Sequence, residues 1–117
     1  HGTTASPFKS AYVAAKHGVV GLTKTVALET AAEAITVNAI CPGYTLTPLL
    51  EDQLLATMQK YEMSRQEVIE KVILAQKPSG AFITSEQLAG TCRFLCSPAA
   101  DQITGTTIHI DGDWTAQ

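Results

Sequence analysis

The chain has 117 residues, of which 45% are hydrophobic and 16% are charged, and its formal net charge is -3. This composition is typical of one globular domain with a modest core. No apolar run reaches the roughly 18 residues of a membrane-spanning helix, and no segment has the pattern of a signal peptide. Because the basic stripe of a nucleic-acid-binding protein is also absent, we expect neither a membrane nor a nucleic-acid partner.

The first predicted element is a long helix. Small and turn-forming residues occupy positions 1–8, and Ser10 is a plausible helix cap. From Ala11 to about Ala32, apolar residues recur near the helical period. The β-branched run from Ile35 to Ile40 then predicts a buried strand, which the Cys41-Pro42-Gly43 turn ends sharply.

Two helices are predicted in the middle of the chain. Thr47-Pro48 is typical of a helix start, with leucines following on an apolar side. Ser64 and Glu67 have the spacing of a capping box, which predicts a second helix over residues 64–75.

A further helix is predicted from Thr84 or Ser85 to about Leu95, and a last strand over residues 106–110. This alternation of helices and strands favours an α/β fold with parallel strands. Two strands are too few for such a sheet, since each leaves an open edge. The sequence therefore predicts further strands upstream of His1.

Three cysteines, Cys41, Cys92 and Cys96, make an odd number. No histidine lies near them in the sequence, so their spacing does not favour a zinc site, and we expect no metal. We interpret them as small buried hydrophobic residues of a protein in a reducing compartment, and therefore expect a cytoplasmic location.

Tyr12 and Lys16 have the spacing of side chains on one helical face, with Cβ atoms about 6 Å apart. A cation at that distance favours the phenolate form, so the tyrosine could exchange a proton with an alcohol near neutral pH. The three N–H donors of Lys16 could also bind ribose hydroxyls. The same spacing also occurs in surface pairs without chemistry, so alone it is weak.

The second candidate feature is the predicted strand end at Pro42-Gly43 and the loop that continues to Thr47. Ligands of open α/β sheets bind at the carboxyl ends of strands. Gly43 would let a flat ring approach the backbone, and Thr47 offers a hydroxyl. When this feature is taken alone, an ordinary turn after a strand is the better explanation.

Together these motifs resemble the short-chain dehydrogenase/reductase family, and the resemblance covers essentially the whole chain. The order of the motifs carries it: the Tyr12–Lys16 helix, the Asn38–Thr47 strand and loop, the helix 85–95 and the ending Ile103-Thr104-Gly105…Ile110-Asp111-Gly112. The resemblance implies a doubly wound, Rossmann-like parallel sheet. Residues 1–117 would be the C-terminal part of one domain whose N-terminal half is missing, with a substrate lid at about 44–83.

The resemblance also implies roles for individual residues. Tyr12 would be the catalytic acid/base, and Lys16 would assist it and bind the nicotinamide ribose. Pro42, Gly43 and Thr47 would line the nicotinamide site, and the hydride would pass between cofactor and substrate. The cofactor would be NAD, with NADP still open, and the complete protein would be a homotetramer.

Some features of the family lie outside this sequence or differ in it. The catalytic serine would stand just before His1, and the glycine-rich phosphate loop further upstream. We therefore expect the 117 residues alone to be inactive. Where the family often ends Asp-Gly-Gly, this chain has Asp111-Gly112-Asp113; aspartate tolerates a positive φ better than most residues.

Within the family, the details are similar to bacterial members that interconvert D-3-hydroxybutyrate and acetoacetate. By that resemblance His1, Lys9 and Gln53 would bind the substrate carboxylate. Reduction of 3-oxoacyl thioesters or other ketones stays open, as does a silent fragment or oligomerisation module. Trp114 would either cover a neighbouring subunit's site or pack on its own domain.

Overall fold

The computed structural model describes residues 1–116, which form two compact units. The first unit contains His1–Cys41 and Ala89–His109, and the second contains Pro42–Leu88 and the chain from Ile110 onward. Among the described residues, no helix combines the length and the apolar character needed to cross a membrane.

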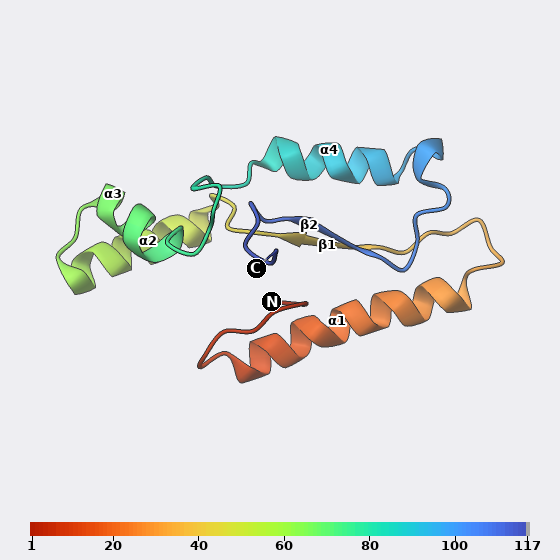
Figure 1. The fold of residues 1–117 in the computed structure, drawn as a ribbon, viewed down its shortest axis with the longest axis horizontal. Helices are drawn as coiled ribbons and strands as arrows, with labels where there is room; N and C mark the ends of the chain where they lie inside the picture. The colour runs from red at the N-terminus through yellow and green to blue at the C-terminus, as the bar shows by residue number, and fades with distance from the viewer. Residues whose placement is uncertain (117) are drawn as a thin grey trace. The chain divides into compact units, whose positions relative to one another are not determined.

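The sheet consists of β1 (Ala39–Pro42) and β2 (Thr107–Ile110), which lie side by side in Figure 1. The Ala39 N–H donates to the Thr106 carbonyl at 2.9 Å, and the Gly43 N–H donates to the Ile110 carbonyl at the same distance. Because the partners advance in the same direction along both strands, the pairing is parallel. The predicted α/β class with parallel strands is confirmed.

The predicted start of the first strand at Ile35 is wrong, because the regular ladder begins only at Ala39. Before it, the Gly105 N–H donates to the Val37 carbonyl at 2.7 Å, but at Asn38 side-chain hydrogen bonds take the place of backbone ones. The Asn38 amide donates to the Ile103 carbonyl at 2.7 Å, and its carbonyl oxygen accepts from the Thr106 N–H at 3.3 Å. Ile35 is 52% exposed, not buried. The strand therefore begins at Ala39 and includes Pro42, which had been placed in the turn.

Helix α1 spans Ser10–Glu29, so it ends earlier than predicted. Its N-cap is Lys9, not Ser10, and Lys9 makes no side-chain capping bond. Only Thr23 and Ala27 are buried on α1. Much of its apolar surface is exposed, including the side chains of Val19, Leu22 and Leu28.

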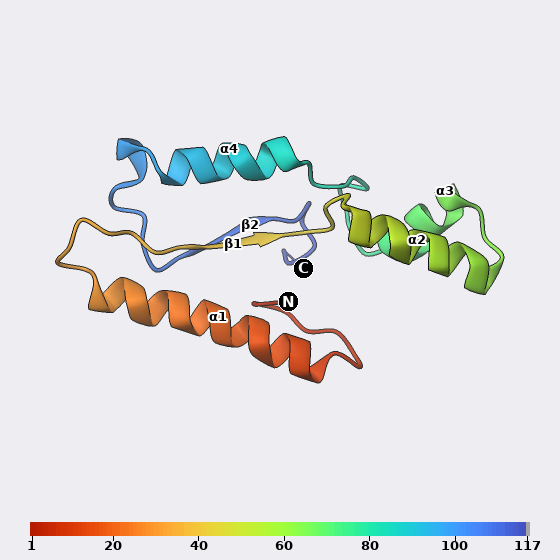
Figure 2. The ribbon, with the colours of Figure 1, turned by 180° about the vertical axis from the view of Figure 1, so that it is seen from behind.

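Figure 2 shows α2 and α3, which pack against each other in the second unit. Helix α2 spans Pro48–Tyr61, and its N-cap Thr47 accepts from the Leu50 N–H, as predicted. Helix α3 is only Arg65–Val68 and continues as a π-helix, η1, over Ile69–Ile73, in place of the single predicted helix. The unit has its own apolar core, made of Leu50, Leu54, Val68, Leu74 and Ile83.

Helix α4 spans Ser85–Leu95 and is followed by a short 3-10 helix, η2, at Pro98–Ala100. Thr84 caps α4, because its hydroxyl accepts from the Gln87 N–H at 3.2 Å while the Gln87 side chain accepts from the Thr84 N–H at 2.9 Å.

The expectation that the cysteines are buried is wrong for Cys92, on α4, and for Cys96, directly after α4, which are both exposed, and Cys41 is only half-buried. No residue of α4 is buried. The burial of such residues depends on what covers the helix.

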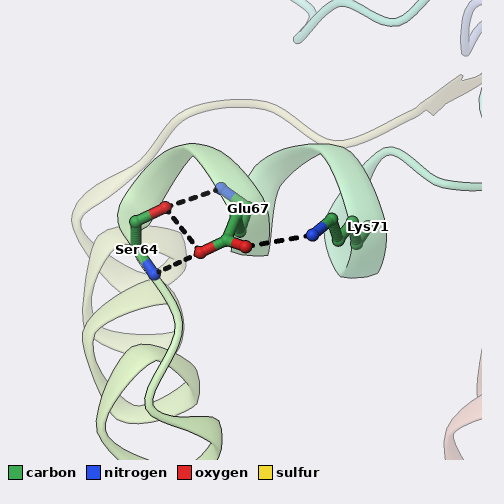
Figure 3. Close-up of polar contacts among 3 residues, drawn as sticks. All are labelled: Ser64, Glu67 and Lys71. Atoms are coloured by element: carbon green, nitrogen blue, oxygen red, sulfur yellow. Dashed lines mark hydrogen bonds and ion pairs between the residues drawn. The ribbon is translucent and has the colours of Figure 1, made fainter.

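The capping box at the start of α3 is confirmed, and Figure 3 shows its contacts. The Glu67 carboxylate accepts from the Lys71 ammonium at 3.0 Å, from the Ser64 N–H at 3.1 Å and from the Ser64 hydroxyl at 2.9 Å. These hydrogen bonds, with that from Lys71 first, lower the pKa of Glu67 from 4.5 to about 2. The charged Glu67 carboxylate therefore stabilises the first turn of α3.

The lowered pKa makes the capping box sensitive to acid. Its stabilisation is complete above pH 4.5 and is lost as the pH falls through about 2, because the protonated carboxyl cannot accept from all these donors. NMR titration should place the Glu67 midpoint near 2. Lys71→Met should move that midpoint upward, whereas Lys60→Met, on α2, should not. A wild-type midpoint at the ordinary glutamate value would contradict this description.

Candidate active site

Tyr12 and Lys16 lie on the same face of α1. The Lys16 Nζ is 5.5 Å from the centroid of the Tyr12 ring, as expected from residues one helical turn apart. The Tyr12 side chain is 51% exposed, so its hydroxyl is open to a reactant. The pair can exchange a proton through the phenol while the ammonium, with its three donors, binds hydroxyl groups of a sugar.

His1 lies against the same tyrosine. The two ring centroids are 5.5 Å apart at an interplanar angle of 74°, an edge-to-face contact. The His1 Nε2 also lies 2.8 Å from the Ser6 hydroxyl. The structure therefore brings His1, Tyr12 and Lys16 together.

Gly2 explains how the first residues reach the helix. A Cβ built on Gly2 would lie 2.8 Å from Val20 Cγ2 and 3.2 Å from the Lys16 carbonyl oxygen. Only a residue without a side chain can approach α1 so closely without displacing it. This contact holds the N-terminal segment against the helix that carries Tyr12.

Lys9 lies at the start of α1 and is exposed. Its carbonyl oxygen accepts from the Val13 N–H at 2.8 Å, which fixes the backbone at this point. The side-chain ammonium takes no part in this hydrogen bond. His17 and His109 have other contacts, with the Val13 carbonyl and the Thr3 hydroxyl, respectively.

The second group of candidate residues surrounds the end of β1. Gly43 lies in a close contact: a Cβ there would be 3.0 Å from Asp111 Cα, 3.1 Å from the Asp111 carbonyl oxygen and 3.1 Å from the Lys77 Nζ. The glycine is therefore required by space. Pro42, directly before it, is exposed at the end of the strand.

Thr47 and Gln53 lie on α2, in the same unit as Gly43. The Thr47 hydroxyl oxygen accepts the Leu50 N–H at 3.3 Å, so its own O–H remains a possible donor to a ligand. Gln53 is exposed in the second turn of the helix.

Lys77 is a further residue of this region, and no motif in the sequence indicates it. This residue is only 6% exposed, and its Nζ lies 4.4 Å from the Trp114 ring centroid and 5.2 Å from that of Tyr44. Burial lowers the pKa of Lys77, while the charge of Asp111 partly opposes that shift. No local pattern marks a buried lysine in a loop, since its neighbours come from distant parts of the chain.

The predicted site residues lie in both units. His1, Lys9, Tyr12 and Lys16 belong to the first unit, whereas Pro42, Gly43, Thr47 and Gln53 belong to the second. Within residues 1–116, no group of three or more histidine, cysteine, aspartate or glutamate side chains is arranged to hold a metal ion.

The C-terminal turn has the geometry that its sequence suggested. Gly112 has a φ of 62° and Asp113 has a φ of 67°, so the third residue of Asp111-Gly112-Asp113 does adopt the left-handed conformation. A Cβ on Gly112 would lie 2.1 Å from the Ser79 hydroxyl oxygen, so this glycine is required for space as well. Trp114 packs on Lys77 of its own chain.

Comparison with known proteins places the chain among oxidoreductases. A family model described as enoyl-(acyl carrier protein) reductase matches residues 1–115. The chain is 55% identical over its full length to D-beta-hydroxybutyrate dehydrogenase of Rhizobium meliloti and 49% identical to that of Cupriavidus necator. In both cases it spans 45% of the relative's length.

Solved structures agree with these relatives. A variant of actinorhodin polyketide ketoreductase with NADPH superposes with a TM-score of 0.87 at 32% identity, covering 99% of this chain and 44% of that one. A short-chain dehydrogenase family protein from Francisella tularensis gives a TM-score of 0.89 at 30% identity, with 97% and 46% of the two chains covered.

The contact at Gly43 predicts a cost for any side chain there. Gly43→Ala should lower the free energy of unfolding of the complete protein by about 1–3 kcal/mol, because the added methyl meets backbone atoms of Asp111 that cannot move cheaply. Gly18→Ala is the matched control: apart from its chain neighbours and the backbone of its own helix, no atom of the described residues lies within 4 Å of a Cβ built there. It should stabilise α1 by about 0.5–1 kcal/mol. Equal denaturant midpoints for Gly43→Ala and wild type would refute the close approach.

Proposed function

We propose that this chain, which belongs to the short-chain dehydrogenase/reductase family, forms part of an enzyme that interconverts D-3-hydroxybutyrate and acetoacetate with a nicotinamide cofactor. The cluster of Tyr12, Lys16 and His1 carries the proposal. The named relatives with 55% and 49% identity support the substrate. The chain spans less than half of their length, so the proposal concerns the complete protein.

Tyr12 is the proton-transfer residue of the proposed reaction. In the oxidation direction its phenolate oxygen takes the hydroxyl proton of the alcohol, and in the reduction direction its hydroxyl returns that proton. The Lys16 ammonium, 5.5 Å from the ring centroid, places a positive charge beside the tyrosine. The bound nicotinamide supplies the hydride acceptor or donor of this reaction.

The residues present fit a nicotinamide cofactor in their chemistry. Lys16 has three N–H donors for the two hydroxyls of a ribose. Gly43 follows the carboxyl end of β1, where ligands of open α/β sheets bind, and the Thr47 O–H is left over after helix capping. The ketoreductase with NADPH in its structure supports this class of cofactor without deciding between NAD and NADP.

The substrate carboxylate is assigned to His1, Lys9 and Gln53. Lys9 supplies a full positive charge near the start of the helix that carries Tyr12, and His1 already contacts the Tyr12 ring. A charged donor strengthens a hydrogen bond to a carboxylate and fixes its position. A small acid held in this way has one end fixed while its hydroxyl meets the phenol.

A 3-oxoacyl or other ketone reductase is the second candidate. The name of the matching family model and the ketoreductase neighbour both favour it. The two candidates share Tyr12 and Lys16 and differ in whether a free carboxylate is bound.

We also propose a homotetramer for the complete protein, which the exposed apolar side chains of α1 support.

The proton-transfer role of Tyr12 is tested by removing only its hydroxyl. In the complete protein, Tyr12→Phe should lower kcat by about 100- to 10,000-fold, because a positioned acid/base contributes a factor of this size. The dissociation constant of the cofactor should change little. The control Tyr61→Phe removes a hydroxyl from a tyrosine that also lies beside a lysine, Lys60, and should keep full turnover. Substantial turnover by Tyr12→Phe would exclude the assigned role.

Lys9 separates the two candidate substrates. Lys9→Ala should raise KM for 3-hydroxybutyrate by about tenfold, because a charged hydrogen bond to the carboxylate is lost, and should leave KM for a neutral ketone unchanged. Lys24→Ala, which removes an exposed lysine from the same helix, should affect neither. An equal rise for the acid and the neutral ketone would favour the ketone-reductase candidate.

A further inference from the structure

Lys77 has an environment that is unusual for a lysine. Its Nζ is buried and has no hydrogen-bond acceptor within the part of the chain that the structure describes. Removing an ammonium from water without hydrogen-bond partners is unfavourable unless other interactions replace its lost hydration. The burial of this ammonium therefore depends on the groups around it.

Two aromatic faces replace part of the lost hydration. The Nζ lies 4.4 Å from the Trp114 ring centroid and 5.2 Å from the Tyr44 ring centroid, both within the range of cation–π attraction. This attraction is stronger for a desolvated cation than for an exposed one. The charge of Asp111 adds a further favourable interaction with the ammonium.

The ammonium thereby joins segments that are far apart in the sequence. Gly43 and Tyr44 follow β1, and Asp111 and Trp114 follow β2. A Cβ on Gly43 would be 3.1 Å from the Lys77 Nζ and 3.0 Å from Asp111 Cα, so the glycine backbone lies close to both.

Backbone hydrogen bonds also link the segment that carries Lys77 to the residues that follow both strands. The Ile83 N–H donates to the Tyr44 carbonyl at 2.8 Å, and the Ser79 N–H donates to the Gly112 carbonyl at 3.3 Å. The segment that carries Lys77 thus contacts the ends of both strands, and the ammonium lies where these contacts meet.

We propose that Lys77 is a positioning residue whose buried ammonium, held between Tyr44 and Trp114, fixes the Gly43 loop against the C-terminal turn in the geometry that binds the nicotinamide cofactor. This inference rests on the proposed function, which assigns Gly43 to the cofactor site. It assigns to Lys77 no contact with substrate and no proton transfer. Loss of the cation frees the loop and weakens cofactor binding, while the chemistry at Tyr12 is retained.

The experiment compares Lys77→Met, Lys77→Arg and Lys60→Met in the complete protein. Methionine keeps the length of the side chain without its charge, and arginine keeps a cation that stacks on aromatic rings. Lys60→Met is the matched control, because Lys60 also lies beside an aromatic ring, at 5.1 Å from Tyr61, but is exposed. The readouts are the dissociation constant of NAD or NADP, whichever the wild type uses, kcat, and amide hydrogen exchange at Gly43 and Ile83.

For Lys77→Met we expect cofactor binding to weaken by about five- to tenfold, the change expected from a buried cation–π contact, with kcat within about twofold of wild type. Exchange at Gly43 and Ile83 should accelerate. Lys77→Arg should restore most of the affinity, and Lys60→Met should resemble wild type. Unchanged affinity and exchange in Lys77→Met would overturn the inference, and so would a loss confined to kcat.

A second variant covers the case in which Lys77→Met does not fold. Trp114→Leu leaves the lysine in place and removes its nearer ring, so the same weakening of cofactor affinity and faster Gly43 exchange are expected. Wild-type values in Trp114→Leu would then overturn the inference. The proposed function fails separately, if the wild-type protein neither binds a nicotinamide cofactor nor oxidises 3-hydroxybutyrate. The hydrogen-exchange comparison reports on the loop in either case.

Discussion

The placement of a phenol and an ammonium one helical turn apart on α1 is the constraint on which the proposed chemistry depends. In the proposed reaction Tyr12 would exchange the proton, and the Lys16 ammonium lies 5.5 Å from its ring centroid. Such a pair needs only a regular helix, because residues four apart lie on the same face whatever else surrounds them. Gly2 lies close to Val20 and Lys16 of the same helix, and His1, next to it in the sequence, contacts the tyrosine ring.

The contacts around Gly43 do not depend on helix spacing as the Tyr12–Lys16 pair does. There the contacts join the ends of two strands to a loop far along the chain, and they depend on a missing side chain and a buried charge. A buried ammonium to which the described residues offer no acceptor is tolerated because the aromatic faces of Tyr44 and Trp114 and the charge of Asp111 offset its lost hydration. This gives a loop without regular secondary structure a defined position, which a flexible glycine would not have alone.

The differences between the predicted and the observed elements have physical causes. The caps at Thr47 and Ser64 were predictable, because a capping hydrogen bond joins residues three apart. The start of the first strand was not, since Asn38 replaces the ladder with bonds to residues more than sixty positions away. The exposure of Cys92 and Cys96 was also not predictable, because the burial of a helix face depends on what packs against it.

By itself, the sequence determined the local features of this protein: the α/β alternation, the helix caps at Thr47 and Ser64, the spacing of Tyr12 and Lys16, and the order of motifs that places the chain in its family. Each depends on residues within a few positions of one another or on their order. Only the tertiary structure decided that Lys77 is buried, that Gly43 has no room for a side chain and that His1 lies against Tyr12. Those facts depend on distances between residues that the order of the chain does not specify.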